Sequence, residues 1–334
     1  MPSKDEDLDM TDRRKPDPGE RAILEFLETR HAHPIEELTA LEGGYWSSAW
    51  AYRADGEDRV LRLGHSGDGY GIDAQAFALA GAHLPIPEVF ERGEALDHHY
   101  ALSRRHAGVI LETRPASQRT ATTRLLGELL FALRAVPTDA SAPPDWYAVV
   151  PDTEAPDAPD WQSWLRRGYA DRSVHDGKGW WSRLDRYPDV REVFDACRAR
   201  IDALLPRCPE RRDLVHGDLL HQNVLVAEDL SAVTAVFSWK CSALGDFLYD
   251  LAWATHWSPW HPCLDPAALY RHVLQSDLLD DADRENADAR HQCYELQIAA
   301  SHFGWFVWTE DDENLLRLTD NARAILEREG PPAG

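Results

Sequence analysis

Residues 214–226 read Leu-Val-His-Gly-Asp-Leu-Leu-His-Gln-Asn-Val-Leu-Val, and no other stretch of the 334-residue chain says as much about its fold. They place Asp218 and Asn223 five residues apart, in a loop that leads into a predicted strand. Phosphoryl transfer needs a carboxylate that orients the attacking hydroxyl, and an oxygen ligand for Mg²⁺ close by. This pair can supply both. The alternative is an ordinary loop with His216 as a core residue, but Asn223 and a following predicted hairpin favour the catalytic interpretation.

The sequence before this loop predicts a small β-rich half. Residues 1–18 are charged and contain three prolines, so we expect a disordered tail. A helix start is predicted at the stretch Asp-Pro-Gly-Glu (17–20). The other elements expected here are strands at 50–53, 59–63, 88–90 and 100–102, a turn at 54–58 and a helix at 71–82.

The sequence from residue 118 onward predicts mostly helices, because leucines recur with helical spacing over 125–133. Further elements expected here are a loop at 137–160, helices at 161–169 and 190–205, a hairpin of 223–226 with 232–237, and mostly helix over 246–329. A small β-rich half before a large helical half predicts an α+β, bilobal protein-kinase-like fold. The nucleotide-binding N-lobe would span 19–105. The C-lobe, with the catalytic loop and substrate-binding helices, would span 106–330.

Composition describes a globular and strongly acidic chain. Hydrophobic residues make up 43% and aromatic residues 10%, which predicts a large packed core. The formal net charge is −23, so we expect no nucleic acid polymer and no anionic membrane as a partner. The charge favours a cationic small-molecule ligand. The alternative is that it serves solubility alone.

Cysteine usage and the N-terminal residues bear on location. The five cysteines are odd in number and form no C-x-x-C pair, which predicts reduced thiols. Residues 1–20 contain no apolar segment of the kind found in signal peptides. No window reaches the ~18 apolar residues of a transmembrane helix. We therefore expect a cytoplasmic monomer.

The Asp218–Asn223 spacing is that of the kinase catalytic loop, and the chain resembles the aminoglycoside phosphotransferase family. That family shares its fold with choline kinases and protein kinases. The closer likeness is to its hygromycin B phosphotransferase branch. The stretches that carry the resemblance, in the family's order, are Arg-Val-Leu-Arg (59–62), Leu-Pro-Ile-Pro-Glu-Val (84–89), Ser-Arg-Arg (103–105), Cys-Pro-Glu (208–210), Gly-Asp-Phe (245–247) and Trp-Ser-Pro-Trp (257–260).

The resemblance implies a role for individual residues. Asp218 would be the catalytic base and Asn223 a ligand of Mg²⁺, with ATP or GTP as the phosphoryl donor. Arg62 would bind the nucleotide phosphates with Asp73 as its acidic partner, although the two could equally form a surface ion pair. Further nucleotide contacts are expected from a flap over the phosphates (Gly43, Gly44, Ser47, Ser48) and from the hinge that meets the adenine (Ser103, Arg105). A Gly-Gly pair before a strand is also compatible with a simple turn.

The family pattern breaks at the end of the hairpin that follows Asn223. An Asp that chelates Mg²⁺ is expected there, but the triplet is Phe-Ser-Trp and Ser238 takes the metal position. A neutral hydroxyl is a poor ligand for a hard dication. Three accounts stay open: a pseudokinase, a natural or engineered inactive variant, or rescue by Asp246 or Asp250. The resemblance implies that Asp246 instead holds the catalytic loop through backbone hydrogen bonds.

A polycationic substrate favours a site of carboxylates and aromatic faces. The substrate-binding candidates in the last third of the chain are Asp246, Trp257, Trp260, Trp305 and Glu310. The alternative is a Trp-rich core beside a solvated acidic loop. The leading hypothesis is an O-phosphotransferase acting on an aminoglycoside or aminocyclitol of the hygromycin type, as in antibiotic resistance. The others are a catalytically impaired pseudokinase that binds nucleotide or drug, and a kinase for another small metabolite.

Overall fold

The computed structural model describes residues 15–42, 44, 46–138, 160–171 and 179–329. The predicted tail over 1–18 and the predicted loop over 137–160 therefore lie almost wholly outside the described residues. The described chain forms two compact units. The first contains residues 15–113 and 218–242, and the second contains residues 114–138, 160–217 and 243–329 with the gap already given.

The first unit is built on a five-stranded antiparallel sheet with strand order β1-β2-β3-β5-β4. Its strands are β1 (Glu36–Leu41), β2 (Ser47–Ala54), β3 (Glu57–Gly64), β4 (Val89–Ala95) and β5 (His98–Arg104). Asp55 and Gly56 join β2 to β3 with φ angles of 54° and 81°. An Asp-Gly pair with positive φ at both residues is the tight turn that suits twisted strands.

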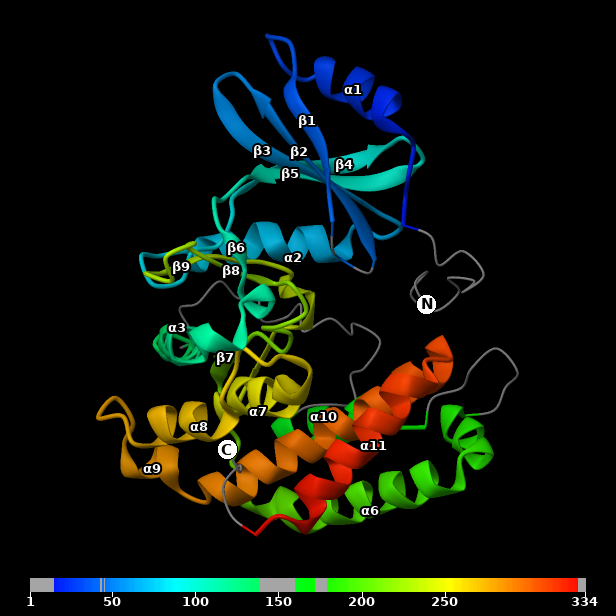
Figure 1. Ribbon diagram of the computed structural model, residues 1–334, viewed down its shortest axis with the longest axis vertical. Helices are drawn as coiled ribbons and strands as arrows, with labels where there is room; N and C mark the ends of the chain where they lie inside the picture. The colour runs from blue at the N-terminus through cyan, green and yellow to red at the C-terminus, as the bar shows by residue number, and fades with distance from the viewer. Residues whose placement is uncertain (1–14, 43, 45, 139–159, 172–178, 330–334) are drawn as a thin grey trace. The chain divides into compact units, whose positions relative to one another are not determined.

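One helix covers this sheet and another leads to the site. Helix α1 (Glu20–Glu28) packs its Ile23 and Leu27 against Tyr52, Leu61 and Leu102 of the sheet (Figure 1). Helix α2 (Asp68–Ala76) follows β3 and buries Asp73. A second, three-stranded sheet of order β6-β8-β9 contains β6 (Val109–Ile110), β8 (Val224–Val226) and β9 (Val233–Val236).

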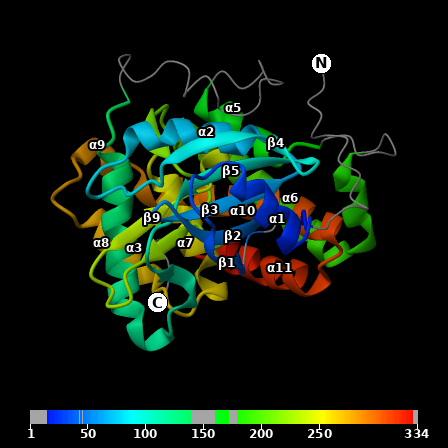
Figure 2. The same ribbon diagram turned by 90° about the horizontal axis from the view of Figure 1, so that it is seen from above.

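The second unit is mainly helical. Its helices are α3 (Arg119–Arg134), α5 (Trp161–Gly168), α6 (Pro188–Leu204), α7 (Leu248–Trp257), α8 (Pro266–Leu274), α9 (Asp281–Arg284), α10 (Ala287–Thr309) and α11 (Asp312–Glu327). Helix α10 packs against α6, α7 and α11, and α11 also packs against α6 (Figure 2). Strands β7 (Asp213–Val215) and β10 (Ala243–Gly245) pair antiparallel beside these helices. Among the described residues, no helix has the length and apolarity needed to cross a membrane.

These elements confirm the predicted β-rich beginning and helical remainder. The boundaries differ where local chemistry was misjudged. Helix α2 begins at Asp68, three residues before the expected start, where the Asp68 N–H donates to the Ser66 hydroxyl. It ends at Ala76 in a 3₁₀ turn over Phe77–Leu79 rather than continuing to residue 82. Strand β4 is longer than expected, because its pairing with β5 continues to Ala95 opposite His98.

Buried polar groups in the second unit make its stability depend on pH. His291 is 1% exposed, and its Nε2 lies 2.8 Å from the Thr255 hydroxyl, which donates to Glu295 at 2.7 Å. Burial lowers the pKa of His291 to about 4 from an ordinary 6.5. The unfolded chain therefore binds a proton between these two pH values that the folded chain does not. The stabilisation is complete above pH 6.5 and is lost as the pH falls toward 4.

We expect His291 to account for about 3 kcal/mol of the unfolding free energy lost on acidification, since one pKa unit is worth about 1.4 kcal/mol. His291→Gln can still donate to Thr255 but does not titrate. Urea unfolding between pH 7.5 and 4.5 should therefore give a flatter pH dependence for this variant. The exposed His33→Gln serves as the matched control. Equal slopes for His291→Gln and the unaltered chain would contradict the assignment.

Candidate active site

The loop before β8 holds the Asp218 carboxylate through both of its oxygens. The Asn223 side-chain N–H group donates to Asp218 Oδ2 at 2.9 Å and to the Asp218 carbonyl at 2.8 Å. His221 Nδ1 lies 2.8 Å from Asp218 Oδ1. Asn223 is 7% exposed, whereas the Asp218 side chain keeps 21% of its surface exposed. Asp218 is therefore fixed in orientation and still accessible.

The loop reaches this geometry through an unfavourable backbone. His221 and Gln222 have φ angles of 59° and 72°, in the left-handed region that side chains other than glycine rarely occupy. The Gln222 N–H donates to the Glu112 carboxylate, which fixes the turn from a neighbouring segment. Burial raises the pKa of Glu112. Strain of about 1–3 kcal/mol per residue persists only where surrounding contacts impose it.

In the second unit, Asp250 holds the residues just before Asp218. Its carboxylate accepts the His216 N–H at 2.7 Å and the Gly217 N–H at 2.8 Å, and Asp250 is 1% exposed. Gly217 has a φ of 74°, which a glycine adopts at little cost. The expectation that Asp246 makes these backbone hydrogen bonds was wrong, because Asp250 on the first turns of α7 makes them.

Asp246 has a different environment. It is fully buried, and Arg290 donates to both of its oxygens at 2.6 and 2.7 Å while the Tyr294 hydroxyl donates at 2.6 Å. A buried ion pair with this geometry is costly to break, because either partner alone would be an uncompensated charge. Rescue of a metal site by Asp246 would require that break.

Arg62, Asp73 and Trp239 form one connected group in the first unit. Arg62 Nη2 donates to Asp73 Oδ2 at 2.6 Å, and the Trp239 backbone N–H donates to Asp73 Oδ1 at 2.8 Å. The Arg62 and Asp73 side chains are 18% and 6% exposed. The pair is thus a largely buried link between β3, α2 and the segment after β9, rather than the surface ion pair that the sequence also allowed.

Ser238 lies at the end of β9 in a left-handed conformation, with φ 69° and ψ 59°. The Phe237 N–H before it donates to the Asn223 carbonyl at 3.1 Å, so Ser238 directly follows a residue that is hydrogen-bonded to Asn223. Two nearby carboxylates already accept hydrogen bonds. Asp73 accepts them from Arg62 and Trp239, and Asp218 is hydrogen-bonded to His221 and Asn223. Within the part of the chain described, no three His, Cys, Asp or Glu side chains gather to hold a metal ion. The two positions at which the family pattern places metal ligands, Asn223 and Ser238, thus carry no carboxylate to hold Mg²⁺.

Comparisons with known proteins identify the family of the chain. Residues 37–296 match the model of the phosphotransferase enzyme family, APH. The chain belongs to this family. It is also 29% identical over 262 residues to the hygromycin-B 4-O-kinase of Escherichia coli, covering 77% of this chain and 72% of that protein.

Solved structures of family members share the fold. A ternary complex of the aminoglycoside phosphotransferase APH(4)-Ia with AMP-PNP and hygromycin B matches with a TM-score of 0.73 and 24% identity, covering 91% of this chain and 98% of that one. The spectinomycin phosphotransferase APH(9)-Ia matches with a TM-score of 0.57 and 11% identity, covering 92% and 96%. At these identities the likeness concerns the fold. It confirms the predicted α+β, kinase-like fold.

Four of the eight nucleotide-side residues predicted from the family pattern lie on the five-stranded sheet: Ser47, Ser48, Arg62 and Ser103. Ser47 and Ser48 begin β2 opposite Gly64 and Leu63. Ser103 is buried in β5 between β3 and β4, and the Arg105 N–H donates to the Asp58 carbonyl at 3.0 Å. Gly44 has a φ of 61° just before β2. Gly43 lies outside the described residues. Contact of these residues with a nucleotide stays a prediction.

The substrate-side candidates of the second unit are less uniform. Asp246 and Trp257 are buried, Trp260 and Trp305 are half-buried, and Glu310 is exposed at the end of α10. The guanidinium of Arg317 already lies 4.7 Å from the centre of the Trp260 ring. A cation thus occupies one aromatic face that a substrate ammonium group could use.

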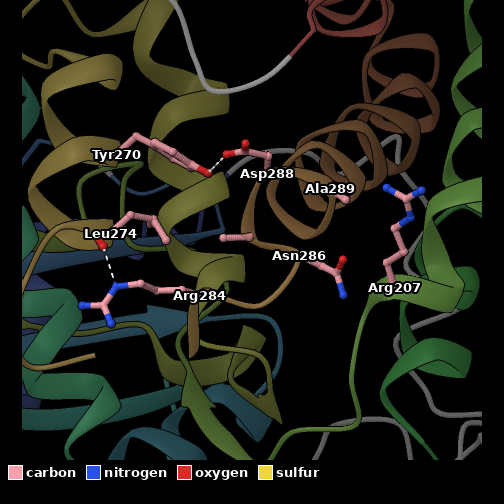
Figure 3. A pocket seen from close by; sticks show the side chains of 8 residues that line it. Arg207, Tyr270, Leu274, Arg284, Asn286, Asp288 and Ala289 are labelled. Carbon is pink, nitrogen blue, oxygen red and sulfur yellow. Dashed lines mark hydrogen bonds between the residues drawn. The ribbon is translucent and has the colours of Figure 1, made fainter. Parts of the chain in front are cut away.

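A pocket of about 390 Å³ in the second unit contains none of the predicted site residues (Figure 3). It is formed around the start of α10. Figure 3 shows two hydrogen bonds in its lining: Tyr270 donates to Asp288, and Arg284 donates to the Leu274 carbonyl at 3.0 Å. Its lining residues are Arg207, Tyr270, Leu274, Arg284, Asn286, Ala287, Asp288 and Ala289.

Three residues that shape the catalytic loop were not predicted for that role. His221 stands three positions after Asp218, and a titratable side chain so close in the motif was a usable signal. Asp250 was considered only as a metal ligand. Glu112 lies far away in the sequence and carries no local signal, because its contact with Gln222 exists only in the folded chain.

The loop-holding role of Asp250 can be tested by Asp250→Asn. Charge-assisted hydrogen bonds are worth about 1.5–3 kcal/mol each, and the amide would present an N–H group to two N–H donors. We expect a loss of about 2–3 kcal/mol in unfolding free energy, with faster amide hydrogen exchange at His216 and Gly217. Asp277→Asn, an exposed position, is the control. Unchanged exchange at these two amides would refute the role.

Proposed function

We propose that the protein is a nucleotide-dependent O-phosphotransferase that modifies a hydroxyl of a cationic aminoglycoside or aminocyclitol of the hygromycin B type. The observation that carries the proposal is the Asp218 carboxylate, oriented through both oxygens by His221 and Asn223 and still accessible. Family membership supports a phosphotransferase, and the named relative supports the substrate class.

In this proposal Asp218 orients the substrate hydroxyl and accepts its proton. The hydroxyl oxygen attacks the γ-phosphorus of ATP or GTP, and the bond from that phosphorus to the β-phosphate oxygen breaks, leaving the nucleoside diphosphate. Phosphoryl transfer depends mainly on positioning and on stabilising charge, so the chain must supply cations and hydrogen-bond donors. Arg62, kept in place by Asp73, is the proposed phosphate-binding cation.

Charge and one curated relative support the proposed substrate class. The chain carries a formal net charge of −23, which favours approach of a polycation. The relative that matches over 262 residues is named for a hygromycin B kinase activity. We propose ATP or GTP as donor, with Trp260, Trp305 and Glu310 as the more accessible substrate-contact candidates, in a cytoplasmic monomer.

Replacing Asp218 tests the proposed base. Asp218→Ala and Asp218→Asn should lower phosphate transfer to hygromycin B by at least about 100-fold, the range expected for loss of a general base. Transfer is measured by the mass of the phosphorylated product, against a panel of aminoglycosides, choline and amino sugars. Glu228→Gln, an exposed carboxylate in the β8–β9 turn, is the matched control. Full activity in Asp218→Ala with a native melting temperature would remove Asp218 from the mechanism.

A second candidate function is supported by Ser238: a catalytically impaired protein that binds nucleotide or drug. With a hydroxyl at this position, the family's Mg²⁺ loses a carboxylate ligand, and hard dications prefer charged oxygen ligands. This candidate differs from the first only in the rate of phosphoryl transfer, because both use the same nucleotide-binding residues. A panel in which choline or an amino sugar is the sole acceptor would instead favour a kinase for another metabolite.

Restoring the carboxylate separates these candidates. Ser238→Asp should raise Mg²⁺-dependent transfer by at least about tenfold, which corresponds to about 1.4 kcal/mol of transition-state stabilisation. Ser238→Asn has a similar shape without the charge and is the control. Activity confined to Ser238→Asp would identify the unaltered chain as impaired. Fast transfer by the unaltered chain, with no gain in the variant, would establish that Ser238 is tolerated.

A further inference from the structure

We propose that this site binds the nucleoside triphosphate without a divalent metal, with the Lys240 ammonium providing positive charge in its place. The inference rests on the proposed function in taking a nucleotide as the ligand. It departs from the metal-dependent nucleotide binding that the family pattern implies. Three observations in the first unit carry it: the ligands at position 238, the rigidity of the segment around it, and the placement of Lys240.

The side chains at the two expected metal-ligand positions, Ser238 and Asn223, are both uncharged. Ser238 offers a hydroxyl and Asn223 an amide oxygen, whereas Mg²⁺ sites usually use one or two carboxylates together with phosphates. Asp73 is 4% exposed, and its two oxygens already bind the Arg62 guanidinium and the Trp239 N–H at 2.6 and 2.8 Å, so it is poorly placed to bind a metal ion. Asp218 keeps 21% of its side-chain surface exposed, but in the proposed reaction it binds the substrate hydroxyl.

The segment around Ser238 is too firmly held to bring in another ligand. Trp239 is fully buried, and its indole N–H donates to the Val236 carbonyl at 3.2 Å. Its carbonyl accepts the Ser242 hydroxyl at 2.6 Å, and its backbone N–H is bound by Asp73. On the other side, the Phe237 N–H is bound to the Asn223 carbonyl. A shift that exchanged Ser238 for another residue would break all four hydrogen bonds.

Lys240 is the cation that this segment presents instead. It is exposed, and it follows Trp239, whose N–H shares the Asp73 carboxylate with Arg62. Its aliphatic stem lies along the first turn of α2, where a β-carbon on Gly69 would be 3.6 Å from Lys240 Cβ and Cδ. Lys240 is thus one residue away from the hydrogen-bonded link formed by Arg62, Asp73 and the Trp239 N–H. An ammonium there can neutralise phosphate oxygens as a compact point charge.

The experiment measures binding of the non-hydrolysable analogue AMP-PNP to the full chain by calorimetric titration, in excess Mg²⁺ and in excess EDTA. For the unaltered chain we expect dissociation constants in the two media within about threefold of each other. Lys240→Met should weaken binding in EDTA by about tenfold, and Lys240→Arg should largely restore it. Arg21→Ala, an exposed cation on α1, should change neither value. Ser238→Asp should make binding Mg²⁺-dependent by more than about tenfold.

Each of the other possible results overturns one part of the proposal. If the unaltered chain binds AMP-PNP more than about tenfold tighter in Mg²⁺ than in EDTA, the metal-independent site is refuted while nucleotide binding stands. If it binds in neither medium, the proposed nucleotide-dependent function falls with it. If Lys240→Met binds as well as the unaltered chain in EDTA, Lys240 is not the compensating cation. Melting curves of every variant identify any loss of binding that comes from unfolding.

Discussion

The Asp73 carboxylate is the constraint on which the first unit's site depends. One oxygen binds the Arg62 guanidinium and the other binds the Trp239 backbone N–H, so a single buried side chain connects β3, α2 and the end of β9. Burying a carboxylate this deeply is favourable only when both oxygens have donors. This link fixes the backbone of Trp239 and so helps to position its two neighbours in the chain, Ser238 and Lys240.

Much of the fold could be predicted because its signals are local. The alternation of residues 50–53 and 59–63 around Asp-Gly predicted the β2–β3 hairpin, and the leucines of 125–133 predicted α3. Strands β1, β6, β7 and β10 were not predicted. Three of these are only two or three residues long and exist through their partners, so their own sequence carries little pattern. The β4 boundary was wrong for the same reason, because its pairing with β5 sets its length, whereas the α2 boundary was wrong because the contact of the Asp68 N–H with Ser66 was overlooked.

The candidate site divides in the same way. Asp218 and Asn223 were identifiable from their spacing in the sequence, and Arg62 and Asp73 from the resemblance to the family. Their supports were not, since Asp250 and Glu112 act through backbone N–H groups of residues 34 and 110 positions away. A carboxylate that binds a backbone amide imposes no side-chain type on its partner. The family resemblance assigned the loop-holding role to Asp246, although the Asp246 carboxylate is hydrogen-bonded to Arg290 and Tyr294.

The buried charges also explain how a chain can keep this fold while it changes the metal position. Asp246 with Arg290, Asp250 with the His216 and Gly217 amides, and Asp73 with Arg62 are each satisfied within their own unit. None of these contacts includes Ser238, so exchanging a carboxylate for a hydroxyl there leaves no buried partner unpaired. The folding contacts and the charge of the nucleotide site are thus separable. Similarity of fold therefore predicts the scaffold better than it predicts which cation neutralises the phosphates.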